Sequence, residues 1–365
     1  MTVLATDVPK ATMIPARCPR PLKPVRVAVV GLGREGVVHA AVLSSVPDCE
    51  LVAVADPRPA ARRNVRGMGC PAPGYPSLEK LLARGAPDAV VVCVPPDRRA
   101  AVARAALEGG AAVLIEPPFA CSAAEAEPLV RLAAEKGLAL GCAHRLAFRS
   151  VFAHAQRVIG GGALGAVRQV RSSLYLSRVF SPAQKRLVLP EGAPGGVLAL
   201  AATDLLFLLT WYFGPPVEVR ATSVKLYGEP EDELHAMMRL ASGAEVGFDT
   251  SWSVPGYPSD AVVVELEAEN GKLLASDDAL ELELIEAHHG LPAGYTRLGR
   301  EDLPQPARFD LGGETQYLQD AAFLEWATGG AAPPSIGAAA LAVLRVVDAL
   351  YASARDGGRR VEVSA

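Results

Sequence analysis

The sequence predicts an α/β protein with two parts, a doubly wound parallel sheet followed by an α+β domain. Between residues 25 and 145, short apolar runs alternate with helical patterns, as in βαβ units. After about residue 146, strand-like runs follow one another without intervening helices, which indicates an antiparallel or mixed sheet. We therefore expect a nucleotide-binding domain over 25–145 and a substrate domain over 146–365. Residues 1–24 contain prolines and charges and are expected to form a flexible arm.

Five apolar runs are the predicted parallel strands: 27–30, 51–55, 89–94, 113–115 and 138–142. Two of the helices between them have recognisable starts. Ser77 precedes one, and Ser122 is followed three residues later by Glu125, which is the spacing of a capping box. Pro128 lies inside the second of these helices and is expected to kink it.

The second part is predicted to begin with helices over 149–159 and 198–212. The strand-like runs are 217–227, 235–240, 245–253, 261–268 and 280–285, and helices over 315–327 and 338–354 close the chain. The run 197–213 is apolar enough to raise a membrane-spanning alternative. Because Thr203 and Asp204 lie in its middle, a buried helix is the prediction.

A glycine-rich turn directly follows the first predicted strand, with Gly31, Gly33 and Gly36 in a Gly-x-Gly-x-x-Gly pattern. In such a motif the first glycine permits a tight turn, the second lets the backbone approach a pyrophosphate, and the third lets the next helix pack closely. The helix N-terminus then presents unpaired N–H groups to the phosphates. The turn, including Arg34 and Glu35, is predicted to bind a dinucleotide.

Asp56 ends the second predicted strand, twenty residues after Gly36, where an acidic residue accepts hydrogen bonds from a ribose diol. A carboxylate there repels a 2′-phosphate, so NAD is the expected cofactor. Arg58 and Arg62 follow closely and keep NADP open as an alternative.

Composition excludes several classes of function. The formal net charge of −4 gives no general attraction to nucleic acid. Residues 1–24 contain no apolar signal segment, so a cytoplasmic protein without a membrane partner is expected. The six cysteines show neither Cys-x-x-Cys nor zinc spacing, and His288-His289 lacks a third ligand at a sensible spacing, so no metal site is predicted.

Further candidates for a substrate site lie outside the glycine turn. His144 and Arg145 directly follow the last predicted parallel strand, where they would orient a substrate or supply a proton. Lys185 precedes the Gly195-Gly196 pair and would contact an anionic substrate, with a plain surface charge as the alternative.

Taken together, these motifs resemble the glucose-fructose oxidoreductase / inositol dehydrogenase / MocA family. The resemblance rests on the glycine turn with its trailing His39-Ala40, Tyr75-Pro76-Ser77-Leu78, residues 88–96, His144-Arg145, Gly195-Gly196, Trp211 with residues 214–217, and Ser251-Trp252. It implies an open C-terminal sheet that forms homodimer or homotetramer contacts, and oxidation or reduction of sugars, cyclitols and related carbonyls. It also implies nucleotide contacts from Val94 and Pro95.

Two departures from the family pattern concern its catalytic groups. The family usually carries Glu-Lys-Pro after the fifth strand, whereas this chain has Glu116-Pro117-Pro118. Proline has neither an ammonium group nor an N–H, so it cannot polarise a carbonyl or share a proton. Glu116 and Pro117 are therefore expected only to shape the nicotinamide pocket.

The second departure is in the family segment Asp-x-Gly-x-His-x-x-Asp, which falls on Leu200, Ala202, Asp204 and Phe207. Asp204 stands where the family has its histidine. A carboxyl group with an ordinary pKa of about 3.9 transfers protons less well at neutral pH than histidine, at about 6.5, although burial can raise the pKa of an aspartate. The alternative is that Asp204 only caps or pairs locally within a buried helix.

The leading hypothesis is an NAD(P)-dependent oxidoreductase that moves hydride between nicotinamide and a small polar carbonyl, sugar-like or imine substrate, with Asp204, His144 or a water handling the proton. Imines are included because the thiazolinyl imine reductases, relatives in this family, also lack the lysine and histidine. The alternative is a non-catalytic or redox-neutral dinucleotide-binding protein, since Pro117, Leu200 and Asp204 replace catalytic groups of the family.

Overall fold

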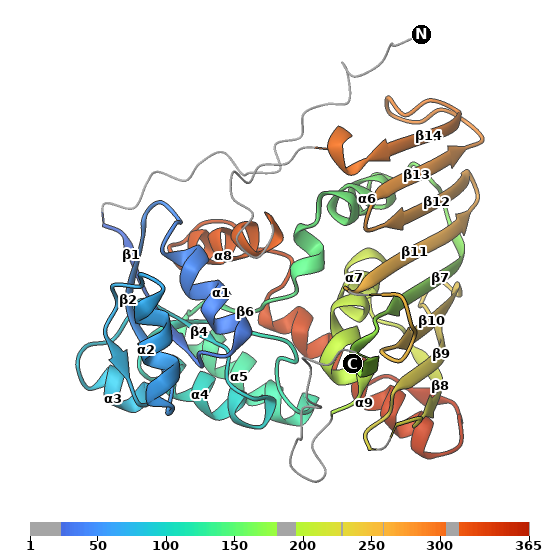
Figure 1. Cartoon of the computed structure of the whole chain (residues 1–365). Coiled ribbons are helices and arrows are strands. Elements are labelled where there is room, and N and C mark those ends of the chain that lie inside the picture. Colours follow the sequence, from blue (N-terminus) through green and yellow to red (C-terminus); the bar gives the residue numbers. More distant parts are fainter. Residues whose placement is uncertain (1–22, 181–194, 228, 258, 304–313, 365) are drawn as a thin grey trace.

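The protein forms two units that stand side by side, each built around its own sheet (Figure 1). This computed structural model describes residues 23–180, 195–227, 229–257, 259–303 and 314–364. Lys185 and nearly all of the predicted N-terminal arm lie outside the described residues.

The first sheet has six parallel strands in the order β3-β2-β1-β4-β5-β6, so the strand order reverses between β1 and β4. The strands are β1 (Val25–Val30), β2 (Cys49–Ala55), β3 (Gly74–Tyr75), β4 (Ala89–Val92), β5 (Ala112–Ile115) and β6 (Leu140–Cys142). The helices are α1 (Arg34–Leu43), α2 (Pro59–Gly67), α3 (Leu78–Leu82), α4 (Pro96–Glu108) and α5 (Ala123–Lys136). The predicted doubly wound parallel sheet is confirmed.

Alternate residues of β1 enter separate apolar clusters on the two faces of this sheet. Val27 and Val29 pack with side chains from α1, whereas Ala28 and Val30 pack with side chains from α4 and α5. This explains why the strands are apolar throughout, because both faces are covered. Two strand limits differ from the prediction: β4 ends before Val94, and β6 begins at Leu140 rather than at residue 138.

The two predicted helix starts are confirmed by side-chain caps. The Ser77 hydroxyl accepts from the Lys80 N–H at 3.4 Å, and that of Ser122 accepts from the Glu125 N–H at 3.3 Å. Glu125 in turn accepts the Cys121 N–H at 2.8 Å. Pro128 lies inside α5, which runs unbroken from Ala123 to Lys136.

The second sheet has nine strands in the order β14-β13-β12-β11-β7-β10-β9-β8-β15. Its strands are β7 (Val167–Tyr175), β8 (Glu218–Val224), β9 (Glu233–Arg239), β10 (Glu245–Ser251), β11 (Ala261–Ala268), β12 (Gly271–Ser276), β13 (Ala279–Leu284), β14 (Gly294–Gly299) and β15 (Val361–Glu362). In the described sheet β7 and β10 pair in parallel and the other neighbours are antiparallel, which confirms a mostly antiparallel second sheet.

The sequence prediction missed strands β3, β7, β12, β14 and β15. The omission of β7 matters most, because this strand lies at the centre of the sheet between β11 and β10. Along β7 only Val170, Ser172 and Leu174 are buried, and the outward positions are mostly polar. A strand covered on one face and rich in polar residues gives a weak sequence signal.

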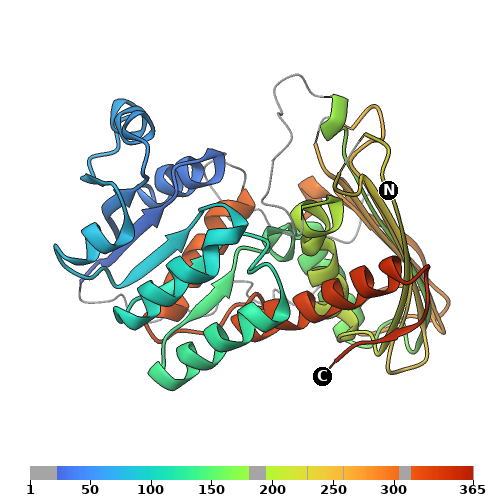
Figure 2. The ribbon, with the colours of Figure 1, turned by 90° about the horizontal axis from the view of Figure 1, so that it is seen from below.

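The described helices of this unit cover one face of the second sheet. They are α6 (Ser150–Gly160), α7 (Thr203–Phe213) and α9 (Gly337–Arg355), and α7 follows a π-helical turn (Leu198–Ala202). None of the described helices lies on the outer face (Figure 2). Helix α8 (Glu314–Ala327) instead packs Phe323 and Leu324 into the core of the first unit.

Helix α9 runs across both units (Figure 2). Ala340, Leu341 and Leu344 belong to the core of the first unit, and Val346 and Leu350 to that of the second. By length and composition alone α9 is apolar enough to cross a membrane, and 56% of that apolar window is buried within the fold. In the run 198–213, every residue from Leu205 to Leu209 is buried, so the helix is covered all round over this turn.

A buried ionic group ties α1 to β5 and α8. His39 contacts Glu116 through Nε2 at 2.8 Å and Asp320 through Nδ1 at 2.9 Å. Burial by itself would lower the pKa of His39, but the carboxylates of Asp320 and Glu116 outweigh burial and raise the pKa to about 10. His39 is therefore an imidazolium at neutral pH.

This group predicts a specific dependence of stability on pH. Because the pKa of His39 is raised from about 6.5 to about 10 on folding, its contribution is complete below pH 6.5 and is lost as the pH rises through 10. We expect the free energy of unfolding of His39→Gln to fall below that of the wild type by on the order of a few kcal/mol at pH 6, and by much less at pH 10. Urea denaturation of both proteins across this range measures the difference, and a pH-independent gap would contradict it.

Candidate functional site

The glycine turn after β1 is packed tightly at two positions and open at the third. A Cβ on Gly31, whose φ is +95°, would lie 2.5 Å from the Cys93 carbonyl oxygen, and one on Gly36 would lie 1.8 Å from the Gly31 carbonyl oxygen. A Cβ on Gly33 would meet no atom within 4 Å. The turn thus holds α1 close to the sheet and leaves space at the helix N-terminus, which fits a pyrophosphate.

Asp56 follows β2 as a buried, ionised carboxylate. Its Oδ2 accepts the Leu32 N–H at 2.8 Å, and the Arg58 guanidinium donates to both carboxylate oxygens at 2.9 Å. Burial would raise the pKa of Asp56, but the hydrogen bonds from Arg58 and Leu32 outweigh it and lower the pKa. Arg62 donates to the Asp56 carbonyl oxygen. The Asp56 carboxylate is therefore an anion at the strand end where a ribose diol would bind, and it is already paired with Arg58.

The ends of β4 and β5 are held together by Arg99, which the sequence prediction missed. Arg99 is 8% exposed and donates from Nε to the Val94 carbonyl at 2.9 Å and from Nη1 to the Pro118 carbonyl at 2.7 Å. The predicted nucleotide contacts Val94, Pro95, Glu116 and Pro117 thus lie on two loops linked by one side chain. An arginine within a helical pattern carries no sequence signal for this role.

His144 and Asp204, predicted separately as catalytic candidates, contact each other. His144 follows β6, Asp204 lies in the first turn of α7, and His144 Nδ1 is 2.8 Å from Asp204 Oδ1. Because the carboxylate only accepts hydrogen bonds, Nδ1 carries the hydrogen. The imidazole stacks on Phe207 with ring centroids 4.6 Å apart, and its Nε2 is buried with no hydrogen-bond partner among the described residues.

The partner of Asp204 therefore comes from the other unit, sixty residues away, rather than from its own helix. Its second oxygen, Oδ2, lies 3.9 Å from Arg145 Nε. Burial would lower the pKa of Arg145, but Asp204 and Asp260 outweigh burial and raise it. Asp204 is thus a partly exposed carboxylate held on one side by an imidazole N–H and faced on the other by a permanent cation.

Two acidic residues near Arg145 were not predicted. Arg145 Nη2 is 3.8 Å from Asp260 Oδ2, and Arg149 Nη2 is 3.4 Å from the same oxygen. Arg149 also pairs with Asp277. Asp260 directly precedes β11 and Asp277 follows β12, so both reach the arginines through pairings of the second sheet that the sequence does not show.

The helix that carries Asp204 is anchored at its start by Glu231, a further residue that sequence analysis missed. Glu231 Oε1 accepts the Leu198 N–H at 3.3 Å and the Tyr351 hydroxyl at 2.9 Å. A Cβ on Gly196 would lie 1.7 Å from the carboxyl carbon of Glu231. The Gly195-Gly196 pair was the available signal, and its second glycine makes room for this buried carboxyl group, whose pKa burial raises.

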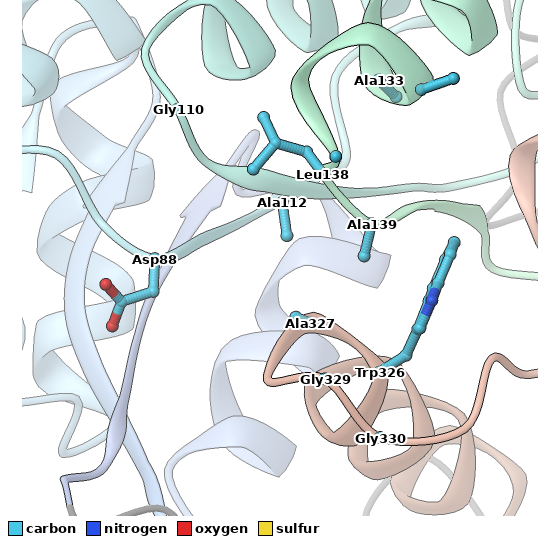
Figure 3. A pocket seen from close by; sticks show the side chains of 12 residues that line it. Asp88, Gly110, Ala112, Ala133, Leu138, Ala139, Trp326, Ala327, Gly329 and Gly330 are labelled. Carbon is cyan, nitrogen blue, oxygen red and sulfur yellow. The ribbon is translucent and has the colours of Figure 1, made fainter.

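A cavity of about 530 Å³ lies at the opposite, amino-terminal edge of the first sheet (Figure 3). It is lined mainly by small residues with Asp88 and Trp326. Its lining contains none of the residues predicted for the site. Across the described residues, no group of three or more His, Cys, Asp or Glu side chains is arranged to hold a metal ion.

Two family models match the chain. The oxidoreductase family model with an NAD-binding Rossmann fold matches residues 25–144, and the GFO/IDH/MocA C-terminal domain matches residues 152–273. The chain is 31% identical to inositol 2-dehydrogenase of Rhizobium meliloti over 147 residues, which are 40% of this chain and 44% of that protein. It is 30% identical to UDP-N-acetylglucosamine 3-dehydrogenase of Acidithiobacillus ferrooxidans over 229 residues, 62% of this chain and 67% of that one.

Solved structures agree over nearly the full length. GenD2 from gentamicin A biosynthesis, in complex with NAD, is 25% identical with a TM-score of 0.80 and covers 97% of this chain and 100% of its own. Levoglucosan dehydrogenase in complex with NADH and L-sorbose, at 20% identity and a TM-score of 0.82, shares the fold over 94% of this chain and 100% of its own. With both family domains present in order, the protein belongs to the Gfo/Idh/MocA family of oxidoreductases and contains its NAD-binding Rossmann domain.

Proposed function

We propose that this protein transfers hydride between NAD and a hydroxyl or carbonyl group of a small, sugar-like substrate, with Asp204 as the proton-transferring residue. The observation that carries the proposal is the 2.8 Å contact between His144 and Asp204, which supplies an acid/base pair although the usual family lysine is Pro117. The names of the relatives, an inositol 2-dehydrogenase and a UDP-N-acetylglucosamine 3-dehydrogenase, support the substrate class.

In this proposal residues 25–145 hold the cofactor and residues 146–365 complete the substrate site. Bound NAD supplies the hydride acceptor. The space at Gly33 would take the pyrophosphate, Asp56 would accept the ribose hydroxyls, and residues of the loops after β4 and β5 would hold the nicotinamide half. The predicted cofactor contacts are Gly31, Gly33, Arg34, Glu35, Gly36, Asp56, Arg58, Val94, Pro95, Glu116, Pro117 and Arg145.

The proton step follows from the environment of Asp204. As a substrate C–H bond gives up its electron pair as hydride, the hydroxyl proton passes to Asp204 Oδ2 and the C=O bond forms. His144 donates to Oδ1 and fixes the orientation of the carboxylate, while Arg145 faces Oδ2. In the reverse direction Asp204 returns the proton to the developing alkoxide.

Asp204→Asn removes the proton acceptor while keeping the size of the side chain. We expect turnover to fall by about 10²- to 10⁴-fold, with the affinity for NADH unchanged. Steady-state assays with polyols, sugar carbonyls and cyclic imines, together with NADH fluorescence titration, measure both quantities. Asp88→Asn, at the opposite edge of the sheet, is the control for loss of one charge.

Undiminished turnover by Asp204→Asn would refute the role of Asp204. Wild-type protein that binds NADH but turns over none of these substrates would favour the non-catalytic alternative instead.

A matched pair of variants tests two roles of the glycine turn separately. One role is helix packing and the other is phosphate binding. Gly33→Ala has space for its Cβ and a φ of −74°, so we expect normal stability but at least about tenfold weaker NADH binding, because the methyl group occupies the phosphate space. Gly36→Ala forces a Cβ against the Gly31 carbonyl and should lower the free energy of unfolding by about 1–3 kcal/mol. Thermal unfolding and fluorescence titration measure the two effects. NADH affinity unchanged in Gly33→Ala would argue against binding at this turn.

We also propose that the protein is a homodimer or homotetramer assembled through the outer face of the second sheet. None of the described helices covers that face (Figure 2), and Ser173 of the central strand β7 faces outward there, opposite Asp249 of β10.

Ser173→Arg places a long cation at the centre of this face. We expect a monomer by size-exclusion chromatography with light scattering, whereas Glu108→Arg, at the exposed end of α4, should leave the wild-type oligomer intact. A monomeric wild-type protein, or an oligomer unaffected by Ser173→Arg, would overturn the proposed interface.

A further inference from the structure

We infer that His39, Asp320 and Glu116 form a buried charged group that holds Glu116 at the nicotinamide end of the site and favours the cationic ring of NAD⁺ over the neutral ring of NADH. The inference rests on the proposed function, because it requires the dinucleotide to bind across the ends of the parallel strands.

The position of Glu116 follows from the sheet topology. Glu116 directly follows β5, and its N–H donates to the Val92 carbonyl of neighbouring β4 at 3.0 Å. The strand order reverses between β1 and β4, and a dinucleotide crosses the sheet at that point. With Asp56, the proposed ribose contact, at the end of β2, the adenosine half would lie over β1–β3. The nicotinamide half would then lie over the ends of β4 and β5, where Glu116 is found.

The orientation of Glu116 is set by His39, which Asp320 holds from the opposite ring nitrogen. His39 is 0% exposed and holds Glu116 Oε1 at 2.8 Å, while Asp320, also buried, holds the opposite ring nitrogen at 2.9 Å. Gln316 donates to the second oxygen of Asp320 at 3.2 Å. Glu116 Oε2 makes no hydrogen bond to a described residue. This oxygen is thus the part of the group left available to a ligand.

The charges of the three residues do not cancel. The two carboxylates flank one imidazolium, which leaves one net negative charge. Arg99, a buried cation, interacts electrostatically with Glu116 and offsets part of this charge, while its Nε and Nη1 donate to the Val94 and Pro118 carbonyls. A fixed anion of this kind, partly shielded from water, stabilises a nearby positive charge more than a neutral ring. The oxidised nicotinamide ring is cationic and the reduced ring is not.

His39 and Asp320 are therefore positioning residues for Glu116, and helix α8 takes part in the cofactor site although it comes from the far end of the chain. Its apolar residues pack α8 against α1, and Asp320 extends that contact to the strand edge through His39.

The test is the ratio of the dissociation constants of NADH and NAD⁺, measured by isothermal titration calorimetry at pH 7.5. Glu116→Gln keeps an oxygen for the His39 N–H and removes the charge. We expect NAD⁺ binding to weaken about tenfold with NADH binding little changed, so that the ratio falls by about the same factor. Asp88→Asn, which also removes one carboxylate but at the other edge of the sheet, should leave the ratio at the wild-type value.

Asp320→Asn tests the positioning part of the inference. It leaves Glu116 in place but removes the second carboxylate, so the ratio should move in the same direction by a smaller factor. Thermal unfolding confirms that each variant is folded before titration. Equal changes in both constants for Glu116→Gln would overturn the charge effect, and an unchanged ratio in Asp320→Asn would overturn the role of α8.

The two proposals fail in different ways. If the wild type binds neither nucleotide, the proposed function fails. If it binds both and the ratio does not respond to Glu116→Gln, only this inference fails.

Discussion

The geometry of the site depends on the burial of helix α9 in two cores at once. Leu341 packs under the parallel sheet, and one to three turns later Val346 and Leu350 pack under the second sheet. Each such side chain contributes about 1.5–3 kcal/mol when it is fully buried. Since α9 is rigid between these two sets of contacts, it fixes the two units relative to each other. The contact between His144 of one unit and Asp204 of the other requires such a fixed relation.

Two positions at which this chain departs from the family pattern both contact His144. The family histidine is replaced by Asp204, and the family aspartate one turn later by Phe207, whose ring stacks on His144. A carboxylate and an imidazole thus lie side by side here as well. In the usual family pattern both belong to the segment over 200–207, whereas in this chain the imidazole is His144, which follows β6. Pro117 supplies no side-chain cation, and the cation that lies beside Asp204 is Arg145, which follows β6 rather than β5.

Buried polar groups in this protein are placed where elements distant in sequence meet. His39 joins α1, β5 and α8, and Glu231 joins the start of the π-helical turn to α9 through Tyr351. Removing one partner leaves the other buried polar group unsatisfied, which costs about 1–3 kcal/mol for a hydrogen bond and several kcal/mol for an ion pair. The same groups that order the fold therefore also restrain the elements that carry Glu116 and Asp204.

Much of the secondary structure of the first unit could be predicted from the sequence alone, because the patterns that indicate it involve residues close together in the chain. Strand-length apolar runs, the spacing of Gly31, Gly33 and Gly36, and the serine caps at Ser77 and Ser122 each depend on residues that are neighbours along the chain. Prediction was weaker in the second unit. Strand β7 has alternating polar residues because one face of its sheet is uncovered, and its parallel pairing with β10 spans more than seventy residues.

The sequence by itself determined the class of the fold, the glycine turn and the vacancy at the lysine position, since residue identity and short-range spacing suffice for these. Only the tertiary structure decided which charged and polar side chains meet. His144 and Asp204 are sixty residues apart, Asp260 and Asp277 reach the arginines through strand pairing, and Asp320 reaches Glu116 through His39. Such contacts arise from packing between distant segments, and no periodicity or local motif encodes them.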